Sequence, residues 1–302
     1  MKKKTFFNDP NGLIPLALSL KERDIVLKHV LVDKNLHDRI HNATPQGTHI
    51  APEFSIEEIE LLTDHVAAAA NHAKDEKIEK TLDKLYNNLA TIGELIDIIK
   101  VRWEKLEQEE QQKAYVKTLP NSVYQLHISL NDIEPVIWRR IQVLGRVSLY
   151  KLNRIIQESM GWTNSHLNMF IINDVKYEVK YENIEEYPEA LDEREFKLWQ
   201  AVQAENVKFT FLYDFGDYWE HSVLVEKILP KEPDVKYPIC LDGKRACPPE
   251  DCGGPPGFIE FVEAVRNPYH EDHQTMIQWV GYKYDPNEFN IELANKRLKR
   301  MR

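Results

Sequence analysis

The stretch Val123-Tyr124-Gln125-Leu126-His127-Ile128-Ser129-Leu130 decides the fold class of this chain. Apolar and polar side chains alternate along it, and a period of two predicts a β-strand with one buried face. Before Asn121 the apolar period is close to 3.6, which predicts helices. The change of period therefore divides the chain into a helical region and a region that contains strands.

A second strand is predicted at Val136–Val143, after a turn at Asn131-Asp132. Arg139 falls on the same face of this strand as Ile137 and Ile141. Because a charged side chain is costly to bury alone, an Arg139 that faces the core is expected to need a carboxylate partner. Arg139 is therefore a candidate functional residue.

A helix and two more strands follow in the sequence. Apolar residues at helical spacing predict a helix at 149–160, with Ser148 as its N-cap and Gly161 as its C-terminal stop. Two short strands flank a turn at Asn173-Asp174, so the region begins in the order β-β-α-β-β. The acidic stretch Glu182–Glu195 is expected to be mobile or loosely helical.

A third hairpin is predicted from Val207–Tyr213 and Trp219–Ile228, because the segment between these two strands supplies turn residues. Gly216 supplies turn chemistry because glycine tolerates a positive φ, and the flanking aspartates can accept bonds from nearby backbone N–H groups. Two helices are predicted beyond the hairpin, at 258–265 and 272–280.

The N-terminal region has the sequence features of a small helical unit. Ser19 with Glu22, and Ser55 with Glu58, match the capping box that opens a helix. A third helix is predicted at 75–97 from its continuous apolar stripe. Such units are typical of interaction or scaffolding modules, since fold alone carries no chemistry.

A domain boundary is expected near residue 118. The charged stretch 100–117 predicts a helical extension or linker, and Leu119-Pro120-Asn121 is a natural stop. We therefore expect a small all-helical unit at 1–118 and a compact mixed α+β domain with antiparallel hairpins at 119–302. The fold class of the whole chain is α+β.

Composition makes several classes of partner less favoured. The chain has 302 residues and a net charge of −10, whereas non-specific nucleic-acid binding needs a basic surface. Three cysteines do not make a disulfide framework in a chain this long, so reduced thiols are expected. No apolar run is long enough to span a bilayer, and residues 5–10 supply no apolar leader core. We expect a cytoplasmic protein without a membrane partner.

Four motifs in a fixed order carry a resemblance to a known family. They are Glu134-Pro135-Val136-Ile137-Trp138-Arg139-Arg140, the helix Leu149–Gly161 followed by Trp162 and His166-Leu167, the stretch Tyr213–His221, and the stretch Ala246–Gly254. With this combination, residues 121–302 resemble the plasmid pRiA4b ORF-3-like family. The resemblance implies a compact α+β domain, sometimes associated with plasmids or insertion elements, and it supplies no established reaction.

Two classes of function remain open for the C-terminal region. In one it is a metal-assisted hydrolase or transferase, with His221 as general base and Asp214 or Asp217 to orient it. In the other it is a binding or regulatory module for a protein, peptide or small-molecule ligand. We favour the binding module, because no nucleophile or cofactor fingerprint stands out. Its candidate binding residues are Arg139, His166, Trp219, Glu250 and Asp251.

The motif at the hairpin also has a purely structural interpretation. The two aspartates can cap the hairpin turn, and His221 can donate to a buried acceptor.

The last motif contains a possible metal site. Cys247 and Cys252 are candidate ligands of a divalent metal such as zinc, but their C-x4-C spacing is at the edge of the usual range. The adjacent Gly253-Gly254 can instead form a rigid loop whose backbone N–H groups hold an anion.

Overall fold

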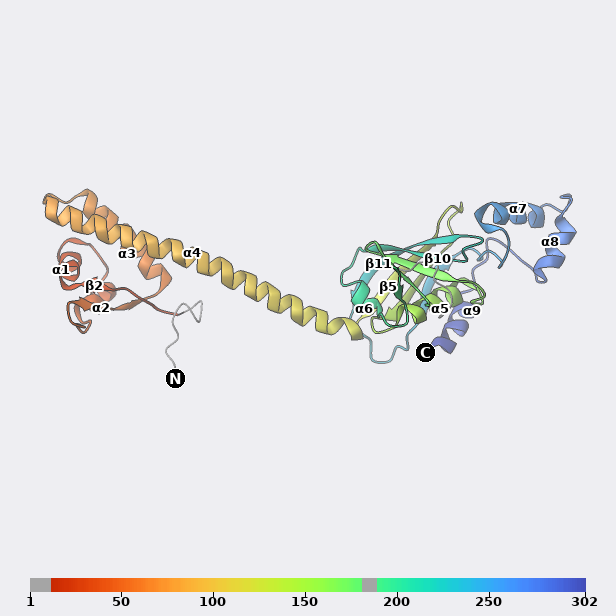
Figure 1. The fold of residues 1–302 in the computed structure, drawn as a ribbon, viewed down its shortest axis with the longest axis horizontal. Coiled ribbons are helices and arrows are strands. Elements are labelled where there is room, and N and C mark those ends of the chain that lie inside the picture. The colour runs from red at the N-terminus through yellow and green to blue at the C-terminus, as the bar shows by residue number, and fades with distance from the viewer. Residues whose placement is uncertain (1–11, 181–188) are drawn as a thin grey trace. The chain divides into compact units, whose positions relative to one another are not determined.

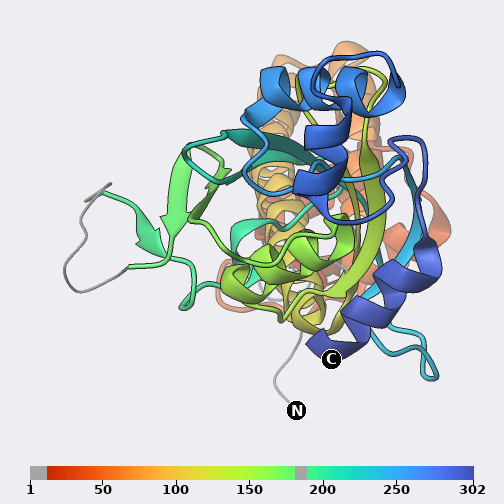
Figure 2. The ribbon, with the colours of Figure 1, turned by 90° about the vertical axis from the view of Figure 1, so that its right-hand side faces the viewer.

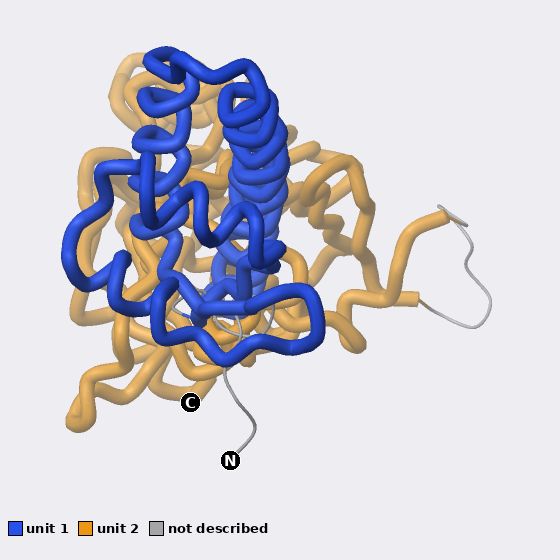
Figure 3. Tube along the Cα trace, turned by 90° about the vertical axis from the view of Figure 1, so that its left-hand side faces the viewer, with its two compact units in different colours: residues 1–112 blue, residues 113–302 orange. Residues whose placement is uncertain are grey.

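The computed structural model of this chain describes residues 12–180 and 189–302. The chain divides into two compact units, residues 1–112 and 113–302 (Figure 3). Each unit has its own hydrophobic core. Two segments discussed above lie outside the described residues. They are residues 5–10, in which no apolar leader core was predicted, and part of the acidic stretch at 182–195.

The helical character of the N-terminal region is confirmed. Its helices are α1 (Leu20–His29), α2 (Lys34–His41), α3 (Ile56–Asn71) and α4 (Glu76–Thr118). Both capping boxes are present, at Ser19 with Glu22 and at Ser55 with Glu58. The structure adds α2 and two small sheets of two-residue strands, in which β1 (Ile14–Pro15) pairs with β4 (Glu53–Phe54) and β2 (Leu18–Ser19) pairs with β3 (His49–Ile50).

The longest element, α4, runs without a break from the predicted third helix through the charged extension (Figure 1). Its buried residues are confined to the first half, at Leu82, Leu85, Leu89 and Ile96. The second half is rich in Glu, Gln and Lys, which are good helix formers without a core to face. No helix in the described part of the chain is both long enough and apolar enough to cross a membrane.

An eight-stranded sheet organises the C-terminal unit. Its strands are β5 (Val123–Leu130), β6 (Trp138–Leu144), β7 (Asn168–Ile172), β8 (Val175–Glu178), β9 (Leu191–Asp192), β10 (Lys208–Tyr213), β11 (Trp219–Leu229) and β12 (Ile239–Lys244). They lie in the order β12-β6-β5-β11-β10-β7-β8-β9. Neighbouring strands are antiparallel except β8 and β9, which are parallel. The predicted hairpins β5–β6, β7–β8 and β10–β11 are confirmed, as is the α+β class.

One expectation about this sheet needs correction, and one of its strands was not predicted. The end of the acidic stretch is not loosely helical, because Leu191–Asp192 forms β9 beside β8. The edge strand β12 has no counterpart in the sequence prediction. It contains Asp242 and Gly243, which are depleted in strands, and its pairing with β6 shifts register between Cys240 and Asp242.

The helices of this unit are α5 (Leu149–Met160), α6 (Leu198–Ala201), α7 (Gly254–Arg266), α8 (His273–Val280) and α9 (Ile291–Leu298). Helix α9 packs against α5 and β12. Helix α7 packs against α8, and both lie beyond the tip of the β10–β11 hairpin (Figures 1 and 2). Helix α7 begins four residues earlier than predicted. Pro255 and Pro256 lie in its first turn, where a backbone N–H would have no intrahelical partner.

Arg139 is buried as predicted, with 1% of its surface exposed, but it has no carboxylate partner among the described residues. Its Nε–H donates to the Ser159 carbonyl at 3.0 Å. Its terminal nitrogens donate to the carbonyls of Trp138, Lys244 and Arg245 at 2.8–2.9 Å. The expectation of a carboxylate was wrong, because backbone carbonyls from three segments satisfy the guanidinium instead.

Candidate functional site

The tip of the β10–β11 hairpin is held by Asp214 and Tyr218, whose φ angles are 60° and 59°. Gly216 does not use the positive φ that glycine tolerates, because Asp214 and Tyr218 adopt the left-handed angles of this turn instead. Aspartate tolerates the left-handed region because its side chain can bond nearby backbone. Asp214 does so, since its Oδ1 accepts the Gly216 N–H at 2.9 Å, and its carbonyl accepts the Tyr218 N–H at 2.7 Å.

The segment before α7 packs directly on this hairpin. The Gly253 N–H donates to Asp217 Oδ2 at 3.1 Å, so a carboxylate of the protein lies at the N-terminus of α7. Gly254 has a φ of 68°, and a Cβ placed on it would collide with the Asp217 carbonyl. The loop is therefore fixed to the hairpin, and an N–H group expected to hold a free anion already has an acceptor.

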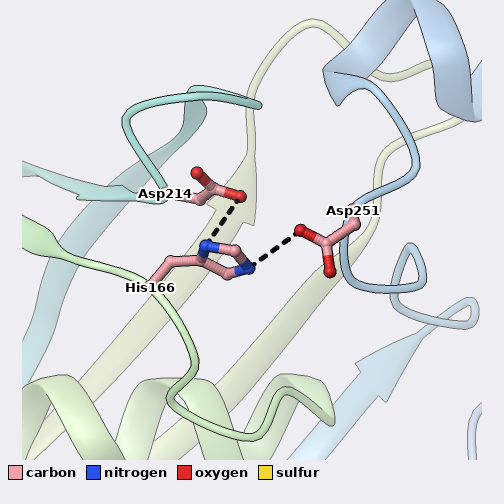
Figure 4. Close-up of side chains that lie close together, drawn as sticks. All are labelled: His166, Asp214 and Asp251. Atoms are coloured by element: carbon pink, nitrogen blue, oxygen red, sulfur yellow. Dashed lines mark ion pairs between the residues drawn. The ribbon is translucent and has the colours of Figure 1, made fainter.

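This contact brings acidic side chains around His166, in the segment between α5 and β7 (Figure 4). The Nδ1 atom of His166 lies 3.6 Å from Asp214 Oδ2. Its Nε2 atom lies 3.1 Å from Asp251 Oδ1 and 3.9 Å from Glu250 Oε2. We call His166, Asp214, Glu250 and Asp251 the His166 cluster; all four are residues expected to be functional from the sequence.

Glu250 is fixed from two sides. The Thr163 N–H donates to Glu250 Oε1 at 2.8 Å, and the Tyr213 hydroxyl lies 3.1 Å from both carboxylate oxygens. Burial and the nearby Glu250 carboxylate raise the pKa of Tyr213, so its hydroxyl stays protonated and donates. Tyr213 and Thr163 were not predicted as site residues. The signal for Thr163 was the polar run Thr163–His166 between a helix and a strand.

His166, Asp214 and Asp251 can each offer one ligand atom to a metal, and these atoms lie within 4.8 Å of one another. Two ligands of a tetrahedral ion with bonds of about 2.1 Å are roughly 3.4 Å apart, so closure by up to about 1.4 Å would suffice. Asp251 is exposed and is the member best placed to move. This is the one group of three such residues in the described part of the chain.

His221 and Trp219 lie in the core, with no exposed surface. The Nδ1–H of His221 donates to the Phe211 carbonyl at 3.1 Å, and its ring meets the Trp162 ring edge-on at 5.3 Å. Burial lowers the pKa of His221 to about 4, so the ring is neutral at pH 7. No hydrogen bond or ion pair among the described residues joins it to Asp214, and its role as general base stays a prediction.

The predicted cysteine site is not assembled in the described residues. Cys247 and Cys252 are free thiols and belong to no group of three ligands. Burial raises the pKa of both, to about 12 for Cys252, which disfavours the thiolates that metals bind. Cys247 instead borders a cavity that also contains Arg139, so Arg139 lies at a different site from the His166 cluster.

Comparison with known proteins agrees with these motifs. Residues 122–293 match the model of the family described as plasmid pRiA4b ORF-3-like protein. The chain is 40% identical over 177 residues to the uncharacterized protein y4hQ of Sinorhizobium fredii, covering 58% of this chain and 90% of that one. A crystal structure of the protein of unknown function MM3350 from Methanosarcina mazei has 34% identity and a TM-score of 0.51, with 57% of this chain and 96% of that chain covered.

These comparisons confirm the resemblance on which the sequence prediction rested. The matched region contains the whole sheet and every residue of the His166 cluster, whereas the helical N-terminal region lies before it. The two relatives carry no stated activity, so the family is one of unknown function. Through residues 122–293, this chain belongs to the plasmid pRiA4b ORF-3-like protein family.

Proposed function

We propose that the C-terminal unit is a binding module that holds one divalent cation through His166, Asp214 and Asp251. The observation that carries this proposal is the convergence of one imidazole and two carboxylates from three separate segments of the chain. A ligand set of one nitrogen and two oxygens suits an ion of intermediate hardness, and we name Zn²⁺ and Mn²⁺.

The charge of the His166 cluster supports a cationic ligand. Three carboxylates surround one imidazole, and no Lys or Arg in the described residues forms an ion pair with any of them. Clustered carboxylates repel one another unless a cation or a proton lies between them. A divalent ion in the cluster would offset this repulsion.

The backbone gives a second line of support. Asp214 and Asp251 both adopt left-handed φ angles, of 60° and 58°. Asp214 is held in this conformation by its own bond from the Gly216 N–H at 2.9 Å, and Asp251 lies in the loop that Asp217 fixes through Gly253. The two carboxylates are thus presented by a hairpin tip and by a loop that is fixed to it.

Isothermal titration of the metal-free full chain with Zn²⁺ and with Mn²⁺ tests this proposal. We expect one bound ion per chain, and at least tenfold weaker binding in His166→Ala. His270→Ala is the matched control, since His270 also faces a carboxylate, that of Asp272 at 4.0 Å, outside the cluster. Equal affinity in His166→Ala and the wild type would refute the assignment.

A metal-assisted hydrolase is the second candidate, favoured by the number of ligands. Three protein ligands leave a coordination position for water, which is the arrangement of catalytic zinc sites. His221 is not part of this version, because its ring is enclosed in the core. Metal-dependent hydrolysis of bis(p-nitrophenyl) phosphate that is lost in Asp251→Asn would support the enzyme. Metal binding without such turnover would leave the binding module.

A further inference from the structure

We propose that the cavity between α5 and α9 is a second binding site, which takes a small aromatic ligand that carries a phosphate group. The cavity has a volume of 440 Å³, within the range of small-molecule sites. It lies inside the C-terminal unit and shares no residue with the His166 cluster. The residues on which the argument rests are Arg139, Tyr282, Phe289, Leu293 and Arg297.

Arg139 supplies a buried positive charge at the inner wall. Its guanidinium has five N–H groups, and four of its hydrogen bonds are to neutral carbonyls. These bonds hold the fork in place and leave the charge without a counterion among the described residues. These four bonds leave one N–H group for a ligand oxygen, and an anion in the adjoining cavity would offset the buried charge, which neutral carbonyls do not cancel.

Arg297 supplies a second positive charge from α9. Its Nη1 atom lies against Gly161, where a Cβ would be only 3.1 Å away, so the glycine leaves room for the guanidinium. Within the described ranges, the guanidinium of Arg297 has no ion pair and no hydrogen bond, although its side chain lines the cavity. Arg140 shows the contrast, since its guanidinium makes two bonds of 2.7 and 2.8 Å to the Glu226 carboxylate.

The acidic residues of the cavity lie at its rim. Asp285 and Glu288 are exposed, as is Lys283, and Asp285 Oδ1 already accepts the Asn287 N–H at 2.9 Å. The inner wall is left with two guanidinium groups. Two positive charges suit the dianion of a phosphate monoester better than a monoanion.

The remaining wall is aromatic. The Phe289 ring lies 4.1 Å from the Arg139 guanidinium carbon, and the Tyr284 hydroxyl donates to the Cys247 carbonyl at 3.1 Å. Tyr282 is 58% exposed, so its ring can cover a ligand that enters. Flat aromatic groups pack well against such rings, and we therefore assign an aromatic body to the phosphate-bearing ligand.

Titration calorimetry of the full chain with phenyl phosphate, at low ionic strength and without added metal, tests the inference. We expect saturable binding that weakens at least tenfold in Arg297→Gln. Arg300→Gln is the matched control, because Arg300 is an exposed arginine three residues further on and does not line the cavity. Its affinity should stay within twofold of the wild type.

A second variant covers the case in which Arg297→Gln does not fold. Leu293 is 43% exposed and lines the cavity, so Leu293→Trp should fill it while the fold is kept, and should also weaken binding at least tenfold. Undetectable binding of phenyl phosphate to the wild type, or undiminished binding in the folded variants, would overturn the inference. Tighter binding of benzoate than of phenyl phosphate would overturn the assignment of phosphate.

This test is independent of the metal proposal. His166→Ala should bind phenyl phosphate like the wild type, and Arg297→Gln should bind Zn²⁺ or Mn²⁺ like the wild type. Loss of both ligands in either variant would point to a folding defect, which circular dichroism would detect.

Discussion

At the scale of single residues, Arg139 shows what an alternating pattern can and cannot predict. The pattern placed it correctly on a buried face between isoleucines. The nature of its partners depended on where the carbonyls of Ser159, Lys244 and Arg245 lie, and these residues are 20 to 106 positions away. A strand pattern carries no information on contacts at that separation.

His221 gives a prediction for pH dependence. Its pKa falls from 6.5 to about 4 on folding, so between these values the unfolded chain binds a proton that the folded chain does not. The free energy of unfolding is therefore highest above pH 6.5, and it decreases as the pH falls from 6.5 towards 4. From pH 7 to pH 5 the free energy of unfolding should drop by about 2 kcal/mol on account of this residue.

Urea unfolding of the wild type and of His221→Phe at the two pH values measures this effect. The wild type should lose about 2 kcal/mol more than the variant between pH 7 and pH 5. The same loss in both proteins would mean that His221 does not stay neutral in the folded chain, and would reopen its assignment as a general base.

At the scale of elements, the contact between the β10–β11 hairpin and the start of α7 positions the His166 cluster. Gly254→Ala should disturb this contact, because alanine disfavours a φ of 68° and its Cβ would meet the Asp217 carbonyl. We expect a loss of about 1–3 kcal/mol in the free energy of unfolding. Metal affinity should fall as well, since Asp251 lies three residues before Gly254.

Gly93→Ala is the control for this substitution. Gly93 lies inside α4, has no positive φ, and would have no atom within 4 Å of an added Cβ. Alanine should therefore be neutral or stabilising there, by up to about 1 kcal/mol. If both variants had wild-type stability and metal affinity, the close contact at Gly254 would not hold the loop in place.

At the scale of the whole molecule, two separate cores predict that the C-terminal unit folds alone. A fragment of residues 119–302 contains the whole family match and both proposed sites. We expect it to be folded by circular dichroism, to unfold cooperatively, and to bind Zn²⁺ or Mn²⁺ with the affinity of the full chain. An unfolded fragment would show that the N-terminal unit is needed and that the boundary at 118 is misplaced.

Much of the fold was predictable because local signals were consistent with it. Capping boxes at Ser19 and Ser55 opened the expected helices, and alternation gave β5, β6, β10 and β11 close to their observed bounds. The exceptions were elements whose residues disfavour the structure they adopt. The edge strand β12 is one, since its pairing with β6 outweighs the weak strand propensity of Asp242 and Gly243.

The sequence by itself determined the α+β class, the helical N-terminal region and the family. It also identified the members of the His166 cluster as candidate functional residues. Periodicity, caps and motifs are local, so they can be read before the chain folds. Only the tertiary structure decided which of those residues meet. It brought His166, Asp214, Glu250 and Asp251 together, enclosed His221 and Trp219 in the core, and placed Arg139 in another cavity. These outcomes depend on the packing of the loop before α7 against the hairpin and of α9 against α5, contacts between distant segments that no local pattern encodes.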